Sequence, residues 1–358
     1  MGFKEKYLKK GPFPYFIAEI GINHNGYSDV AKRMIDASKE AGANAVKFQK
    51  RDIKQLLRTG TVLEEPTGYL SRDEHDISQE KKAYGTWVYP DKRVELTDEQ
   101  HLELWKYAES IGIDYLVSPW EEMSVDFLVE HNAKAIKLAS IDTTNYQFCE
   151  YIASKGIPTI ISTGMTKYEQ LIIVRDIFKK ASCPMIFLHC TSAYPSPLED
   201  KNLRCITRMK KMFNIDIGFS GHATGIEGTL GAVSLGANVV EKHVTLNRKM
   251  NGTDHAASLE FSEFSDLIIK SRNIVLALGS DEKKFLDSEK VLFHVLSKRF
   301  ITTCEIKAGD KITKNKIRSA VIKKEGGIFV DQYYNILGTK VLKDLKPNHI
   351  LENQDLEW

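Results

Sequence analysis

Short apolar segments alternate along this chain with longer segments in which apolar residues recur every three or four positions. The short segments are typical of buried strands and the longer ones of amphipathic helices, so the alternation predicts parallel strands joined by helices. We expect strands at residues 15–20, 45–48, 114–118, 135–138, 158–162, 185–189, 216–220 and 239–243. We expect the helices that follow them at residues 29–41, 97–110, 124–131, 147–155, 167–180, 203–213, 226–235 and 262–278. Eight such pairs predict an α/β fold, a (β/α)8 TIM barrel, over residues 1–280.

The pattern changes near Asp281, where a charged stretch over residues 281–287 is interpreted as a linker. Beyond it, residues 288–358 contain short β-prone pieces separated by turn residues. We predict a small β-rich domain there. At about 70 residues its core would be small, so we expect it to dock on another surface.

One connection in the predicted barrel is far longer than the others. Residues 50–96 show no clear periodicity and contain prolines and glycines, such as Pro66 and Gly85. Loops of this length in a compact domain are usually lids or binding loops. Because this loop follows the second strand, we expect it to lie over the catalytic face.

Composition excludes several functional classes. Apolar residues make up 42% and charged residues 27% of the chain, and the formal net charge is only +2. This excess is too small to suggest binding to nucleic acid or to a membrane surface, and no apolar run is long enough to cross a bilayer. The five cysteines form no CxxC pair and the N-terminus has no apolar signal segment, which together favour a cytoplasmic protein.

Two histidines, His222 and His243, end neighbouring predicted strands. The carboxyl ends of barrel strands form the face on which active sites are built. Two imidazoles at that face predict a site for a divalent transition metal, because neutral imidazole is a good ligand for such ions. The alternative is that one or both histidines are hydrogen-bonded loop residues.

Lys47 and Lys137 lie inside apolar strands, where an ammonium group does not easily reach bulk water. A lysine so placed usually needs an anionic partner or has a catalytic role, which includes a Schiff base with a carbonyl substrate. The plainer alternative is a lysine at the strand end that reaches the surface. Hydroxyl groups follow the neighbouring strands, at Ser118, Ser140, Ser162 and Ser220. Two ammonium groups with several hydroxyls favour a phosphate site.

Glu19 ends the first strand, so a carboxylate joins the predicted metal and phosphate sites. A metal ion and a carboxylate together can polarise a carbonyl group and transfer a proton. A buried acid in this position can also simply form a salt bridge. Neither a Walker loop nor a GxGxxG motif is present, which disfavours nucleotide binding.

These residues lie in motifs that resemble the sialic acid (N-acetylneuraminate) synthase family. The matching segments are residues 18–26 (AEIGINHNG), 46–49 (VKFQ), 162–165 (STGM), 189–195 (HCTSAYP), 218–222 (GFSGH) and 241–243 (EKH). They occur in the family's order and spacing. The resemblance spans nearly the whole chain, including a C-terminal part similar to the antifreeze-like SAF domain.

The resemblance implies an enzyme that condenses phosphoenolpyruvate with an N-acetylmannosamine-type sugar, free or 6-phosphorylated. It implies that His222 and His243 bind Mn²⁺, or Mg²⁺ or Co²⁺ in its place. Glu19, Lys47 and Lys137 would be catalytic. The residues expected to hold phosphoenolpyruvate are Lys47, Ser118, Lys137, Ser140, Ser162, Ser192 and Ser220. Those expected to face the sugar are Gln49, Tyr194, Asp254 and, from the partner chain, Lys323. The family also implies a homodimer with swapped C-terminal domains.

Two departures from the family pattern concern the acceptor sugar. Ser192 stands where some bacterial members have asparagine, and Lys323 stands near the place where many members have an arginine in the SAF domain. Lysine keeps the charge of arginine but loses its planar fork. The competing interpretations are another synthase of this kind, for pseudaminic or legionaminic acid, a Schiff-base lyase using Lys137, or a non-catalytic carbohydrate-binding protein.

Overall fold

The computed structural model describes residues 2–52, 94–323 and 326–358. The chain divides into two compact units, Met1–Gly279 and Ser280–Trp358. Most of the long loop expected at residues 50–96 lies outside the described residues. In the described part of the chain, no helix is long and apolar enough to span a membrane.

The first unit contains eight parallel strands in sequence order, and the last strand pairs with the first to close a barrel. The strands are β1 (Tyr15–Gly21), β2 (Ala45–Lys50), β3 (Asp114–Pro119), β4 (Ile136–Leu138), β5 (Thr159–Ser162), β6 (Met185–Cys190), β7 (Ile217–Gly221) and β8 (Val239–Thr245). A short strand, β9 (Leu259–Glu260), adds to β8 in parallel. The predicted (β/α)8 fold is confirmed.

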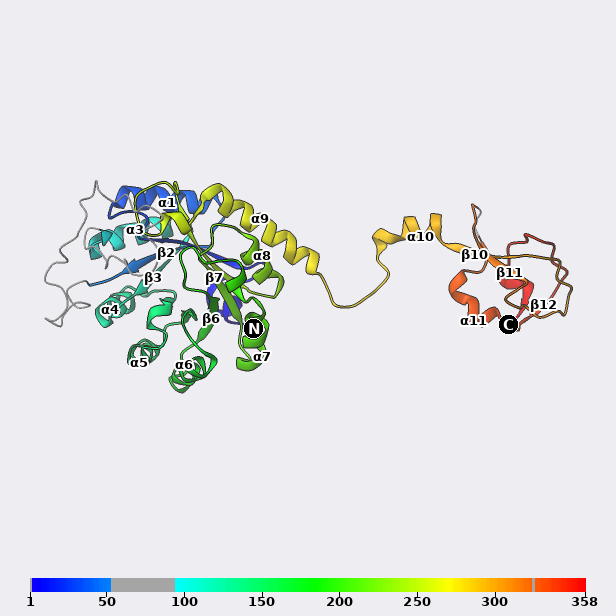
Figure 1. The fold of residues 1–358 in the computed structure, drawn as a ribbon, viewed down its shortest axis with the longest axis horizontal. Coiled ribbons are helices and arrows are strands. Elements are labelled where there is room, and N and C mark those ends of the chain that lie inside the picture. The colour runs from blue at the N-terminus through cyan, green and yellow to red at the C-terminus, as the bar shows by residue number, and fades with distance from the viewer. Residues whose placement is uncertain (1, 53–93, 324–325) are drawn as a thin grey trace. The chain divides into compact units, whose positions relative to one another are not determined.

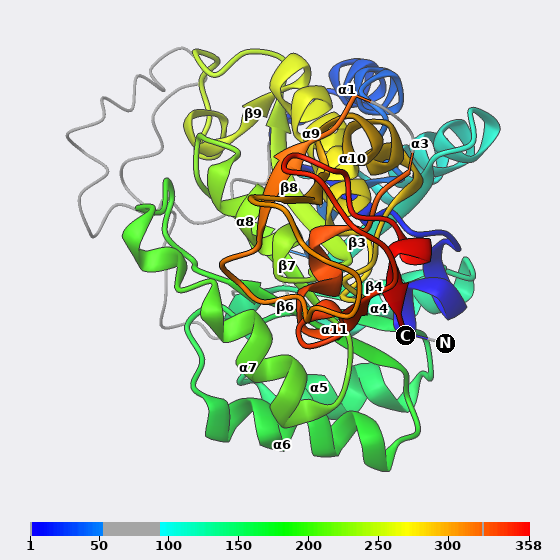
Figure 2. The ribbon, with the colours of Figure 1, turned by 90° about the vertical axis from the view of Figure 1, so that its right-hand side faces the viewer.

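Helices surround the strands (Figures 1 and 2). They are α1 (Ser28–Glu40), α3 (Asp98–Ser110), α4 (Glu122–Glu130), α5 (Tyr146–Ser154), α6 (Tyr168–Lys180), α7 (Arg204–Phe213), α8 (Glu227–Ser234) and α9 (Phe261–Leu278). Each buries an apolar stripe, such as Ile206, Met209 and Phe213 of α7. These side chains and the outward-facing strand residues form the large core between strands and helices.

A second apolar cluster fills the amino-terminal end of the barrel. It includes Ile17, Leu116 and Ile160, which are fully or almost fully buried. A short π-helix, Lys4–Leu8, precedes β1 and adds Leu8 to this cluster. Because the strands fill this end with apolar side chains, polar groups that point into the barrel are confined to its carboxyl end.

The second unit has its own small core of isoleucine, leucine and valine residues. Its elements are α10 (Lys290–Leu296), β10 (Lys298–Thr302), β11 (Ile317–Val321), α11 (Tyr333–Ile336), β12 (Lys340–Val341) and β13 (Leu356–Glu357). The strands form two antiparallel pairs, β10 with β11 and β12 with β13. The helix α10 was not expected in this part of the chain.

Candidate active site

Period-two alternation along the strands places the predicted polar residues inside the barrel. In β1, Ile17 belongs to the inner apolar cluster, so Glu19, two residues later, faces the same side. In β2, Lys47 faces the same side as Ala45, and in β8, Glu241 faces the same side as Val239, because Ala45 and Val239 also belong to the inner cluster. The resulting polar layer lies directly above the apolar cluster.

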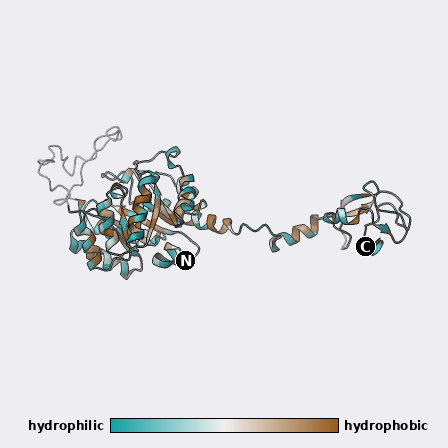
Figure 3. Cartoon of the chain, turned by 90° about the horizontal axis from the view of Figure 1, so that it is seen from below, coloured by the Kyte–Doolittle hydropathy of each residue, from teal (hydrophilic) through white to brown (hydrophobic). Residues whose placement is uncertain are grey.

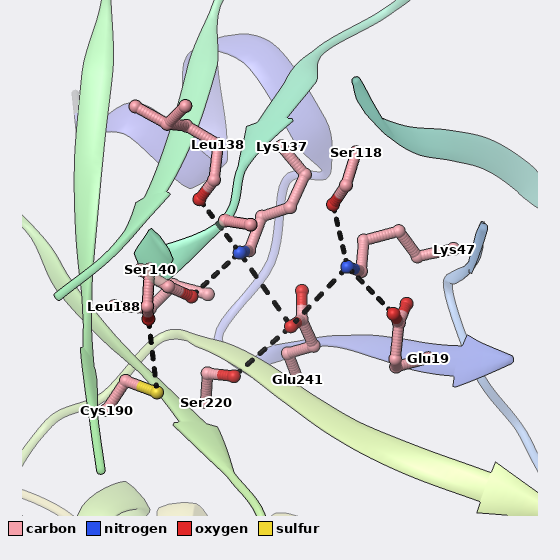
Figure 4. A network of polar contacts seen from close by, with 12 residues as sticks. Glu19, Lys47, Ser118, Lys137, Leu138, Ser140, Leu188, Cys190, Ser220 and Glu241 are labelled. Atoms are coloured by element: carbon pink, nitrogen blue, oxygen red, sulfur yellow. Dashed lines mark hydrogen bonds and ion pairs between the residues drawn. The ribbon is translucent and has the colours of Figure 1, made fainter. Parts of the chain in front are cut away.

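Two buried lysines form the centre of this layer (Figure 4). Lys47 Nζ lies 3.0 Å from Glu19 Oε1 and donates to Ser118 Oγ at 2.8 Å. Lys137 Nζ donates to Ser162 Oγ at 2.7 Å and to the Leu138 carbonyl at 3.1 Å. An ammonium group has three N–H donors, so each lysine keeps one that none of these hydrogen bonds uses.

Glu241 lies between the two lysines, and sequence reasoning did not assign it a role. Its Oε1 atom is 3.8 Å from Lys47 Nζ and 3.9 Å from Lys137 Nζ, and it accepts a hydrogen bond from Ser220 Oγ at 3.1 Å. The signal was present in the sequence: Glu241 is two positions before His243, so both face the barrel interior. The anionic partner that the lysines require is thus supplied in part by the protein itself.

Burial and close charges shift the pKa values of these groups. Burial raises the pKa of Glu19 to about 7, although Lys47 opposes the shift, and Glu241 adds to it. Burial would also raise the pKa of Glu241, but Lys137, Lys47 and His222 together lower it. The pKa of Lys137 is lowered by burial. A titratable carboxyl next to a carboxylate that stays ionised is a pattern typical of acid–base sites.

The two predicted metal ligands lie together at the same end of the barrel. The ring centroids of His222 and His243 are 5.3 Å apart, and both side chains are buried. His222 Nδ1 contacts the Thr191 carbonyl oxygen at 3.0 Å, and its Nε2 contacts the Tyr194 hydroxyl at 2.8 Å. His222 is thus hydrogen-bonded, as the alternative to a metal site expected.

The donor set fits a metal that keeps open positions. In the part of the chain that the structure describes, no group forms a hydrogen bond with the buried His243 Nδ1. Burial lowers the pKa of His243 well below its usual value, so its ring is neutral at pH 7. Among the described residues, no group of three or more His, Cys, Asp and Glu side chains is arranged to hold a metal ion. Burial opposes protonation of His222, but Cys190 and the Thr191 carbonyl outweigh it and raise the pKa of His222. A metal would therefore displace a proton from this ring, and the two imidazoles would leave the other coordination positions to water or substrate.

The remaining residues expected at the phosphate site form a hydroxyl-lined wall next to Lys137. Ser140 Oγ accepts a hydrogen bond from the Gly164 backbone N–H at 3.0 Å. A Cβ atom on Gly164 would lie 2.0 Å from Ser192 Oγ, so only glycine fits against that serine. Cys190 Sγ lies 3.6 Å from Ser140 Oγ and 3.8 Å from Ser192 Oγ.

The residues expected to face the sugar occupy different places. Gln49 Nε2 donates to Glu19 Oε1 at 3.4 Å, and Tyr194 contacts His222, as described above. Asp254 is buried, and its Oδ2 atom lies 3.8 Å from His243 Nδ1. Lys323 belongs to the second unit, where it is exposed. The first three of these residues thus lie beside the histidines and Glu19.

Burial of Glu19 generates a prediction about stability. Because the pKa rises from 4.5 to about 7 on folding, the folded protein binds more protons than the unfolded chain between these values. The free energy of unfolding should therefore fall as pH rises from 4.5 through 7, and the Glu19→Gln variant should lack this loss. We expect the difference in the free energy of unfolding between the wild type and Glu19→Gln to change by on the order of 2 kcal/mol between pH 5 and pH 8.

Urea unfolding at several pH values measures this difference in the free energy of unfolding. The Glu130→Gln variant, which alters an exposed residue of α4, serves as the control and should follow the wild type at every pH. If the free energy of unfolding depends on pH in the same way for the wild type and Glu19→Gln, the Glu19 carboxyl does not titrate in this range.

Comparisons with known proteins identify the family of this chain. The model of the NeuB family matches residues 34–283 of the chain. N-acetylneuraminate-9-phosphate synthase of Mus musculus is 38% identical over 349 residues, which cover 97% of this chain and 94% of the mouse protein. N,N'-diacetyllegionaminic acid synthase of Legionella pneumophila is 31% identical over 96% of this chain and 94% of its own length.

A solved structure is similar as well. The N-acetylneuraminic acid (sialic acid) synthetase of Leptospira borgpetersenii, in complex with citrate, superposes with a TM-score of 0.68 at 31% identity. The match covers 78% of this chain and 90% of the bacterial chain. The family model covers well over half of the chain and the mouse protein matches nearly all of it, so the resemblance expected from the sequence motifs is confirmed. The chain belongs to the NeuB family.

Proposed function

We propose that this protein condenses phosphoenolpyruvate with an N-acetylmannosamine-type sugar and water, giving a sialic acid and inorganic phosphate. The observation that supports this most strongly is the pair of buried lysines, Lys47 and Lys137, each with an N–H left for a ligand. A phosphate that contacts both ammonium groups would receive two charge-assisted hydrogen bonds inside a buried site. The similarity to the mouse protein favours a 6-phosphorylated sugar and a 9-phosphate product.

The reaction balances as follows. The enol carbon of phosphoenolpyruvate forms a carbon–carbon bond with the aldehyde carbon of the open-chain sugar. The oxygen of water then bonds to the carbon that carried the phosphate, and the bond from that carbon to the phosphate oxygen breaks. The water oxygen becomes the new carbonyl oxygen, so the water gives up two protons: one is gained by the aldehyde oxygen and the other leaves with the phosphate. A single titrating carboxyl group close to the aldehyde oxygen and the water can relay the first of these protons.

Glu19 is the residue proposed for these proton transfers. A phosphate near the lysines would raise its pKa further, because a nearby like charge disfavours ionisation. With its pKa already near 7 in the free protein, Glu19 would then hold a proton when phosphoenolpyruvate binds. Glu19 lies opposite His243 in the pairing of β1 with β8, so it can reach a sugar oxygen placed beside the histidines.

We propose that His222 and His243 hold Mn²⁺ or a similar divalent ion. Such an ion would polarise the aldehyde oxygen. Gln49, Tyr194 and Asp254 would orient the sugar, since they surround the histidines and Glu19. Ser118, Ser140, Ser162, Ser192 and Ser220 would complete the site for phosphoenolpyruvate.

The first test is release of phosphate. We expect the protein to release phosphate from phosphoenolpyruvate only when Mn²⁺ and an N-acetylmannosamine-type sugar are both present, and more readily with the 6-phosphate. Chelation should abolish release and Mn²⁺ should restore it, whereas the His222→Ala and His243→Ala variants should stay inactive because each loses an imidazole. The assay follows inorganic phosphate with a panel of free and 6-phosphorylated N-acetylhexosamines.

The same panel separates the alternatives. Turnover with pseudaminic or legionaminic acid precursors alone would reassign the acceptor. No release with any sugar would favour a non-catalytic carbohydrate-binding protein. Activity that resists chelation, together with trapping of pyruvate on Lys137 by borohydride, would instead indicate a Schiff-base lyase.

A second prediction concerns the lysines. Lys47→Ala and Lys137→Ala should weaken the use of phosphoenolpyruvate much more than that of the sugar. Loss of a charge-assisted contact in a buried site costs roughly 2–4 kcal/mol, or about 30- to 1000-fold in kcat/KM. Steady-state kinetics with each substrate varied in turn measures the effect, and Lys155→Ala on the barrel surface is the control. An equal loss for both substrates would indicate that the lysines are structural.

We also propose a homodimer in which the second unit, an SAF-like domain, covers the barrel of the partner. The segment from Phe285 to Leu296 supports this, because it is rich in apolar residues (Figure 3) and several of their side chains are exposed. The exposed fraction is 56% for Phe285, 76% for Val291 and 58% for Val295. Apolar segments of this kind mark contact surfaces. Lys323 would then complete the partner's sugar site.

Mixing two inactive chains tests this arrangement. A His222→Ala chain supplies a second unit but no metal site, and a chain lacking residues 288–358 supplies an intact barrel. If each barrel needs the partner's second unit, the mixture should recover part of the activity, up to one site in each mixed dimer. Phosphate release after confirmed subunit exchange measures it, and mixing two His222→Ala preparations is the control. Exchange without recovered activity would contradict the swapped arrangement.

A further inference from the structure

Lys242 is a buried lysine that the proposed chemistry does not use. It lies between Glu241 and His243 on β8 and faces the opposite side of the strand, away from the barrel interior. Its side chain is 1% exposed, and in the described part of the chain no carboxylate forms an ion pair with it. Burying an ammonium group without a carboxylate is costly, so its contacts require an explanation.

The contact of Lys242 is with the loop that follows β7. Its Nζ donates a hydrogen bond to the carbonyl oxygen of Ala223, the residue directly after His222. The register between β7 and β8 ends at the pair Gly221 and Lys242. His222 and Ala223 therefore lie beyond the last paired residue of β7, and the lysine side chain extends the connection between the two strands past that point.

The other side of this loop is held by the segment after β6. The backbone N–H of Ser196 donates to the His222 carbonyl at 2.9 Å, and the His222 ring contacts the Thr191 carbonyl oxygen. Lys242 provides the hydrogen bond from the β8 side. Its stem also packs on β7, since a Cβ atom on Gly221 would lie 3.3 Å from Lys242 Cδ.

We propose that Lys242 is a positioning residue that sets the separation of the His222 and His243 imidazoles. Its side chain is hydrogen-bonded to the carbonyl group of Ala223, which follows His222, and its own backbone directly precedes His243. A single side chain thus connects the backbone next to both proposed ligands. This inference rests on the proposed metal role of the two histidines. Residues that orient metal ligands typically contribute 10- to 100-fold to metal affinity.

The test compares Lys242→Met with the wild type and with a matched control. Methionine keeps an unbranched apolar stem but has no ammonium group. Lys4 is the control because it is also buried, at 2% exposed, and donates to the carbonyl oxygens of Gly11 and Phe13 in the segment before β1. Lys4→Met removes an equivalent contact far along the chain from both histidines.

Binding of Mn²⁺ alone is measured by titration with electron paramagnetic resonance, and pulsed measurements count the imidazole nitrogens coupled to the ion. We expect Lys242→Met to bind Mn²⁺ about 10- to 100-fold more weakly than wild type. We also expect its nitrogen signal to fall from two imidazoles toward one. Lys4→Met should match the wild type in both measurements, whatever it loses in thermal stability.

Each outcome has a distinct meaning. If Lys242→Met binds Mn²⁺ like the wild type and shows two imidazoles, Lys242 has only a structural role and the inference fails. If the wild type itself binds no Mn²⁺, the proposed metal role fails first. If Lys242→Met does not fold, Lys242→Leu replaces it, because leucine is likewise apolar and has no N–H donor for the Ala223 carbonyl. Wild-type affinity in that variant would equally overturn the inference.

Discussion

The constraint on which this active site depends is the burial of four charges in one layer of a closed barrel. Lys47, Lys137, Glu19 and Glu241 lie within about 4 Å of a partner of opposite charge and are almost inaccessible to water. Such a cluster is costly unless its members compensate one another. The compensation is incomplete, because each lysine keeps a donor that the described hydrogen bonds do not use and burial raises the pKa of Glu19 to about 7.

The barrel makes this arrangement possible because its two ends are different. Apolar side chains fill the amino-terminal end, and the π-helix Lys4–Leu8 contributes to that filling. Each strand then continues for one or two inward positions into the polar layer. The charged groups are thus supported from below by a packed core. Preorganised charge of this kind is an efficient means of stabilising a transition state.

The loop that carries His222 is held by hydrogen bonds from residues outside the barrel interior. Thr191 and Ser196 hold the His222 loop from one side, and Lys242 reaches it from β8. The loop that carries His222 is therefore hydrogen-bonded both to the segment after β6 and to β8.

The sequence by itself determined the eight strand–helix pairs, since hydrophobic periodicity is a local property. It also determined which strand ends carry Lys47, Lys137, His222 and His243, because parallel strands bring their carboxyl ends to one face. It did not reveal that Glu241 lies between the lysines or that Lys242 reaches Ala223. Those contacts depend on strand register and barrel closure, which join residues distant along the chain. Only the tertiary structure decided them, because a pKa value or an ion pair depends on distances that local pattern does not contain.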